Sequence, residues 1–221
     1  MPRPFTDHEN EVIRKRLVQH GYRLFSAHGL AKTNVEELAR AAGISKGAFY
    51  KFYESKEALF MDIMEQTEVR VRKELLAVID LPGPSPRARL FAALKKGFAL
   101  FDELPVLQIF TGTDYELLFS RIPSSTLQEH LDADRLFLDE FIARCRAAGI
   151  PVRVGSEQIT SLLYPLVLAI LHREDLGPQA LGGSIDVLLE LVAAYCLGEI
   201  RLGRPSGKRK ARKDPNYELI H

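Results

Sequence analysis

The chain has 221 residues, of which 46% are hydrophobic and 27% charged, a balance that is typical of globular proteins and excludes a wholly disordered chain. The net charge of +1 gives no indication of a partner. The two cysteines are far apart and have no His at ligand spacing, so we expect no metal, no disulfide framework and a reducing compartment. The longest apolar run, "LLYPLVLAIL", is too short to span a bilayer, and we expect a cytoplasmic protein without a membrane segment.

Spacings of three and four between apolar residues recur along the chain, whereas strand patterns are scarce. The sequence therefore predicts an all-α fold with about nine helices. The first helix should begin at Thr6, which forms the Thr-x-x-Glu pattern of a capping box with Glu9. We expect it to end at Gly29.

A second Thr-x-x-Glu pattern, Thr33 with Glu36, predicts a shorter helix that ends at Gly43. Glycine suits that end because it enters the left-handed region without a Cβ clash. Ser45 then has the position of a cap for a third helix, which we expect to run through Phe52.

The third predicted helix has two contrasting faces. Apolar side chains at helical spacing form one face, namely Ala48, Phe49 and Phe52. The opposite face has cations and a phenol around a position without a side chain, namely Lys46, Gly47, Tyr50 and Lys51. The first face predicts burial and the second predicts contact with a partner.

The remainder of the chain is also predicted to be helical. Ser55 has the position of a cap for a long fourth helix reaching about Asp80, where "DLPGPSPRA" interrupts the pattern. Further helical stretches are predicted at about 86–103, 105–119, 124–148, 156–173 and 183–202. The segment 204–221 has no apolar periodicity, and we expect a basic, disordered tail.

Two short helices joined by "AGIS" match the helix-turn-helix arrangement, which places its second helix in the major groove of DNA. The absence of a side chain at Gly47 permits close approach to the groove. Lys46 and Lys51 can then reach guanine O6 or N7, or a phosphate. Tyr50 and Tyr53 are placed to donate hydroxyls to phosphates, and Lys56 to bind a phosphate at the start of the fourth helix.

The run "TNVEELARAAGISKGAFYKFYESKEALF" resembles the DNA-binding signature of the TetR family of transcriptional regulators, and the resemblance covers residues 10–64. It implies phosphate contacts at Thr33, Tyr50 and Lys56. It also places Lys46, Gly47 and Ala48 at recognition-helix positions. We expect Ser45, the cap of the same helix, to be part of the DNA-binding site as well. Lys51 stands where the family commonly has histidine or tryptophan, so base preference at that position is open.

The charge distribution is consistent with this arrangement. Residues 1–56 have ten Lys and Arg against six Asp and Glu, residues 57–203 have 14 against 21, and residues 204–221 have six against two. We expect a DNA-binding domain at 1–56, a helical ligand-binding and dimerisation domain at 57–203, and the tail. The tail is either a solvated segment or an extra nonspecific nucleic-acid contact.

Helix-turn-helix units commonly bind as pairs, and the stretches 156–173 and 183–202 have wide apolar faces that predict a homodimer interface. The resemblance also implies a small-molecule effector, apolar or amphipathic, bound in the C-terminal half, and repression as the commoner outcome. Polar candidates among its aromatic residues are Thr111, Thr113, Asp114, His130 and Tyr164. No cofactor is implied.

Two alternatives stay open at this stage. The first is a ligand-independent architectural DNA-binding protein, which would not prefer a palindromic operator over random DNA. The second is a helical enzyme or scaffold with an incidental helix pair. No nucleophile elbow, phosphate loop or dinucleotide fingerprint occurs in the sequence, so we expect no enzymatic activity.

Overall fold

The computed structural model describes residues 5–110, 120–172 and 183–200, and within these residues every regular element is helical. The all-α prediction is therefore confirmed. The elements are α1 (Asp7–Lys32), α2 (Val35–Ala42), α3 (Lys46–Phe49), α4 (Lys56–Asp80), α5 (Pro86–Glu103), the 3-10 helix η1 (Pro105–Phe110), α7 (Ser124–Ala147), α8 (Ser156–Leu171) and α10 (Ser184–Cys196).

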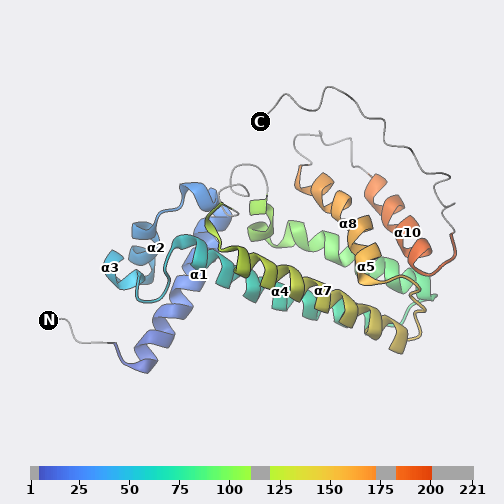
Figure 1. Ribbon diagram of the computed structural model, residues 1–221, viewed down its shortest axis with the longest axis horizontal. Helices are drawn as coiled ribbons and strands as arrows, with labels where there is room; N and C mark the ends of the chain where they lie inside the picture. Colours follow the sequence, from blue (N-terminus) through green and yellow to red (C-terminus); the bar gives the residue numbers. More distant parts are fainter. Residues whose placement is uncertain (1–4, 111–119, 173–182, 201–221) are drawn as a thin grey trace, which may run out of the picture.

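The first three helices gather at one end of the molecule, and α8 and α10 lie at the other (Figure 1). Helix α4 runs between the two ends. It contacts α1 at the first end, and along its length it contacts α5 and α7. Helices α8 and α10 contact each other, and α10 also packs on α5. The arrangement separates a small N-terminal helix cluster from a larger helical body.

Helix α1 begins as predicted, because Thr6 and Glu9 form both hydrogen bonds of the capping box. Its end differs from the prediction. Gly29 has φ 77° and ψ 172°, which kinks the helix, and helical structure then resumes and continues to Lys32. Gly29 therefore bends α1 where the sequence predicted its end.

The later helices agree with the predicted ranges, with three differences. Helix α3 ends at Phe49 and turns replace its predicted last residues, so it has only four residues. The stretch predicted at 105–119 is the 3-10 helix η1 up to Phe110, and residues 111–119 lie outside the described residues. The last helix ends at Cys196, before the predicted 202.

Two hydrophobic cores hold the described residues together. The first joins α1, α2 and α3 to the N-terminal half of α4, and it also includes Leu100 and Leu104 near the end of α5. The second joins the C-terminal half of α4 to the later helices, with Ile79 fully buried in it. The boundary predicted at residue 56 falls inside the first core, and the division of the chain into these domains stays a prediction.

Within the described residues, no helix is long and apolar enough to cross a membrane.

The aromatic pair Phe25 and Phe60 shows how closely α1 and α4 pack, since both are fully buried with ring centroids 5.5 Å apart. The predicted basic tail at 204–221 lies outside the described residues.

At Gly21, α1 and α4 approach each other closely. A Cβ atom there would lie 2.8 Å from Cδ1 of Ile63 and 3.1 Å from Cδ2 of Leu59, and both of these side chains are buried. We predict that Gly21→Val lowers the free energy of unfolding by about 1–3 kcal/mol through overpacking, measured by urea denaturation.

Gly47→Ala is the matched control, because a Cβ atom at Gly47 meets no atom within 4 Å. Alanine also has the higher helix propensity, so this variant should keep or gain up to about 1 kcal/mol. A Gly21→Val protein as stable as the wild type would contradict the close approach of the two helices.

Candidate nucleic-acid interface

The turn between α2 and α3 has the geometry that the glycine predicted. Gly43 adopts φ 78° and ψ 28°, the left-handed conformation, and its N–H donates to the carbonyls of Ala39 and Arg40. The N–H of Ile44 also donates to the carbonyl of Ala39, at 2.9 Å. These bonds satisfy carbonyls that the end of α2 would otherwise leave unpaired, and they fix the direction in which α3 departs.

Helix α3 is short and is held at both ends. Its cap is Ser45, as predicted, whose hydroxyl accepts a hydrogen bond from the N–H of Ala48 at 3.2 Å. After Phe49 the chain continues in turns, with the N–H of Tyr53 bonded to the Phe49 carbonyl. Since a four-residue helix is not stable alone, the cap and the turn are essential to its shape.

The two predicted faces of α3 are confirmed. Phe49 is completely buried in the first core, and Phe52 packs against that core. The opposite face is exposed to solvent, and it includes Ser45, Lys46, Gly47, Tyr50 and Lys51. Ala48 is half-buried between the two faces. We call these five exposed residues the α3 face, and the predicted contacts Thr33 and Lys56 lie outside it.

Aromatic contacts orient two side chains of the α3 face. The Tyr50 ring packs edge-on against Phe49, with centroids 5.6 Å apart, while 52% of the residue stays exposed. The Lys51 ammonium lies over the Phe5 ring, 5.9 Å from its centroid. Both side chains therefore keep their polar ends in solvent while their apolar parts rest on the protein.

The prediction that Thr33 caps the start of α2 is wrong. Asn34 caps α2, because its Oδ1 accepts from the N–H of Glu37 at 2.9 Å. Thr33 is completely buried, and its hydroxyl donates to the Gly29 carbonyl at 2.7 Å. The same hydroxyl also contacts the Leu24 carbonyl, at 3.4 Å. The geometry therefore gives no support to a phosphate contact from the Thr33 side chain.

Lys56 binds carbonyls of its own chain in this structure, and its predicted phosphate contact stays a prediction. Its ammonium donates to the carbonyls of Leu30 at 2.6 Å, Ala31 at 3.2 Å and Thr33 at 2.8 Å, at the end of α1. A lysine has three donors, and here all three serve the last carbonyls of a helix, where a cation is electrostatically favoured. Lys56 joins α1 to α4 in this structure, where the sequence predicted a phosphate contact.

Tyr53 is likewise turned away from solvent. The residue is buried, and its hydroxyl donates a short hydrogen bond to Asp62 of α4. Burial, together with the neighbouring Asp62 carboxylate, raises the pKa of Tyr53 well above the usual range of a phenol. Arg14 lies over the same ring, 5.2 Å from its centroid. Tyr53 therefore fixes the segment after α3 and is not placed to bind phosphate.

Two helices joined by a left-handed glycine, the second with an exposed cationic face, define the class of helix-turn-helix DNA-binding proteins. The family model described as "Bacterial regulatory proteins, tetR family" matches residues 17–63, which include α2, α3 and the start of α4. Residues 17–63 therefore match the DNA-binding region of the TetR family of transcriptional regulators.

Comparisons over longer stretches agree. The chain is 28% identical over 169 residues to the HTH-type transcriptional regulator YdgC of Bacillus subtilis, covering 71% of this chain and 86% of YdgC. A TetR-family regulator from Mesorhizobium loti shares the fold with a TM-score of 0.61 at 16% identity, covering 88% of this chain and 98% of that one. The FadR repressor of Thermus thermophilus, solved with lauroyl-CoA, has a TM-score of 0.59 at 20% identity, covering 88% and 99%. Relatives of this kind are regulators and not enzymes, in agreement with the expectation from the sequence.

The three bonds of the Lys56 ammonium generate a prediction about stability. Lys56→Met keeps the length and apolar stem but leaves the end of α1 without its cation, so the free energy of unfolding should fall by about 1–3 kcal/mol. Denaturation in urea without DNA measures this. Lys51→Met, at an exposed position on the α3 face, should change stability by less than about 0.5 kcal/mol. If Lys56→Met and Lys51→Met are equally stable, the bonds of the Lys56 ammonium do not stabilise the contact between α1 and α4.

Proposed function

We propose that this regulator is a ligand-responsive repressor that binds a palindromic operator as a homodimer, in the cytoplasm, where the DNA is. The exposed α3 face carries this proposal, because it presents cations, a phenol and a bare glycine on one surface backed by the buried Phe49. In this arrangement Gly47 permits close approach to the base edges, and Lys46 reaches a guanine or a phosphate.

The proposed roles of the other residues follow from their positions. Tyr50 donates its hydroxyl to a phosphate, since its ring is fixed against Phe49 and its outer part is exposed. Lys51 contributes a cation whose base preference is undetermined. The backbone at the capped start of α3, near Ser45 and Ala48, lies at the surface of the same face. Thr33 and Lys56 support this surface from within, through their contacts at the end of α1.

The proposal predicts how operator affinity changes with salt. On a DNA fragment selected by the wild-type protein from a random pool, Lys46→Ala should lower the slope of log affinity against log salt by about 1. Tyr50→Phe should weaken binding by about tenfold through one lost hydrogen bond, with the slope unchanged. Fluorescence anisotropy at several salt concentrations measures both.

Lys73→Ala is the control, because Lys73 is an exposed lysine on α4 in the helical body. It should leave both the affinity and the slope unchanged. A Lys46→Ala protein that behaves like Lys73→Ala would exclude the α3 face from DNA binding. Equal affinity of the wild type for selected and random DNA would favour an architectural role over an operator-specific one.

A second copy of this chain is the proposed partner of α8 and α10. Each of these helices buries one face in the second core, with Ile159 and Leu189 buried there. Each also exposes large apolar side chains on another face, namely Tyr164 and Leu168 on α8 and Val187, Leu188 and Leu191 on α10. Adjacent helices with exposed apolar faces are typical of an isologous dimer interface.

Sedimentation tests the dimer. The wild type at micromolar concentration should sediment at twice the chain mass of 24.9 kDa, and Leu191→Arg should shift it to the single-chain mass, because a buried unpaired charge opposes association. Leu136→Arg is the control, since Leu136 on α7 is 65% exposed and outside the proposed interface. A wild type that sediments at 24.9 kDa would overturn the dimer.

The effector part of the proposal has support from the relatives rather than from a cavity in the described residues. The Thermus thermophilus FadR repressor was solved with lauroyl-CoA, an amphipathic molecule. We infer an apolar or amphipathic effector for this chain as well. A ligand that prefers one arrangement of the dimer by about 100-fold shifts that equilibrium by about 2.7 kcal/mol, enough to release DNA. Thr111, Thr113 and Asp114 lie outside the described residues, and Tyr164 belongs to the exposed face of α8.

A further inference from the structure

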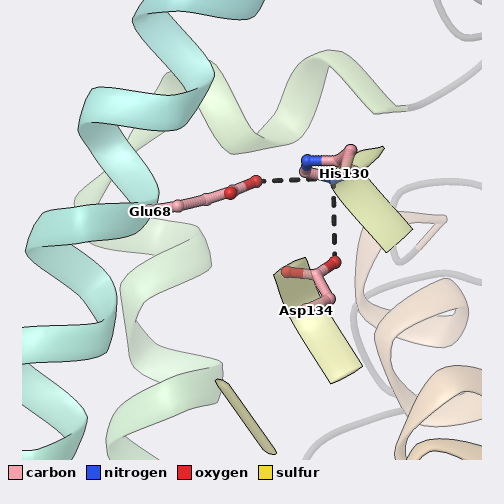
Figure 2. A group of neighbouring side chains, drawn as sticks. All are labelled: Glu68, His130 and Asp134. Atoms are coloured by element: carbon pink, nitrogen blue, oxygen red, sulfur yellow. Dashed lines mark ion pairs between the residues drawn. The ribbon is translucent and has the colours of Figure 1, made fainter. Parts of the chain in front are cut away.

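Three side chains with metal-binding atoms meet between α4 and α7, away from the α3 face. Glu68 comes from α4, while His130 and Asp134 come from successive turns of α7 (Figure 2). Nε2 of His130 lies 3.5 Å from Oε1 of Glu68 and 3.7 Å from Oδ2 of Asp134. The three ligand atoms all lie within 4.8 Å of one another. This group is not apparent in the sequence, because Glu68 is far from the other two residues along the chain.

The distances fit a metal site of a particular geometry. A tetrahedral zinc ion with bonds of about 2.0–2.1 Å holds neighbouring ligand atoms about 3.3–3.4 Å apart. The two distances from His130 exceed this spacing by only a few tenths of an ångström. The two carboxylate oxygens lie within 4.8 Å of each other. An imidazole with two carboxylates is a ligand set that zinc and similar divalent ions accept.

Arg72 organises the group without occupying its centre. One guanidinium nitrogen of Arg72 contacts Oε2 of Glu68 at 3.3 Å and Oδ1 of Asp134 at 3.1 Å. These are the opposite oxygens of the two carboxylates, so Oε1 and Oδ2 remain directed at His130. The guanidinium itself lies over the Phe137 ring, 5.4 Å from its centroid. Arg72 thus has the position of an outer residue that orients metal ligands.

We propose that Glu68, His130 and Asp134 bind one divalent transition-metal ion of the zinc type, with water at the fourth position. The ion joins α4 to α7 inside the helical body. The contacts of Arg72 support this, because it pairs with one oxygen of each carboxylate and leaves the other oxygen of each facing His130, where one cation can bind both.

Titration of the full-length chain, without a histidine tag and without DNA, tests the site. Isothermal titration with Zn²⁺ should show one ion bound per chain. Glu68→Gln, His130→Ala and Asp134→Asn should each weaken that binding by about 100-fold or more, since each removes one of three ligands. Co²⁺ in place of Zn²⁺ should give the intense visible absorption of a tetrahedral site in the wild type, and His130→Ala should lose it.

Matched variants separate the site from general effects of charge. Glu65→Gln, His28→Ala and Asp132→Asn remove the same groups at positions outside the cluster, and each should bind Zn²⁺ within about twofold of the wild type. Zn²⁺ should also raise the Tm of the wild type and not that of His130→Ala. Circular dichroism checks the folding of each variant, and the near-isosteric Glu68→Gln gives the same comparison if His130→Ala does not fold.

Two results would overturn the proposal. One is a wild type that binds Zn²⁺ no more tightly than Glu68→Gln or His130→Ala. The other is a Co²⁺ spectrum that the His130 substitution leaves unchanged. Either would identify the group as an ion-pair network between α4 and α7, held by Arg72 alone. None of these experiments uses DNA, so their results are independent of the proposed DNA-binding function.

Discussion

The proposed DNA-binding surface depends on the burial of Phe49. A four-residue helix has too few internal hydrogen bonds to hold its own shape, so α3 exists only because its inner side is fixed to the first core. Phe49 supplies that attachment with no exposed surface, and Ser45 satisfies an N–H at the start of the helix. With the inner side fixed, the outer side can be almost bare at Gly47. The same short segment therefore combines rigid support with an open surface.

Local patterns predicted the parts of the fold that depend on local contacts. The caps at Thr6, Ser45 and Ser55 and the left-handed turn at Gly43 each involve residues within five positions of one another, and each is confirmed. The two faces of α3 followed from helical spacing in the same way. The failure at Thr33 has a physical reason, because Thr33 and Asn34 both precede a glutamate by three residues. Only the kink at Gly29, a feature of the folded chain, decides which of them caps α2.

The contacts that the sequence did not reveal are those between distant segments. Lys56 reaches back 26 residues to the Leu30 carbonyl, and nothing in the pattern around a lysine distinguishes a helix-capping ammonium from a phosphate-binding one. Tyr53 similarly has the spacing of an exposed tyrosine, yet Asp62 and Arg14 enclose it. Glu68 meets His130 only because α4 and α7 lie side by side. Which distant residues become neighbours depends on how the helices pack, and a single sequence does not show that packing.

Helix α4 connects these distant contacts to one another. At its first residue, the Lys56 ammonium holds the Leu30, Ala31 and Thr33 carbonyls, directly before α2 begins. About three turns later, Glu68 and Arg72 contact α7, and still further along Ile79 is buried in the second core. A rotation of α4 would have to stretch the three Lys56 bonds at the end of α1 or move that end together with α2, which follows it. The position of α4 therefore constrains the direction of the α3 face.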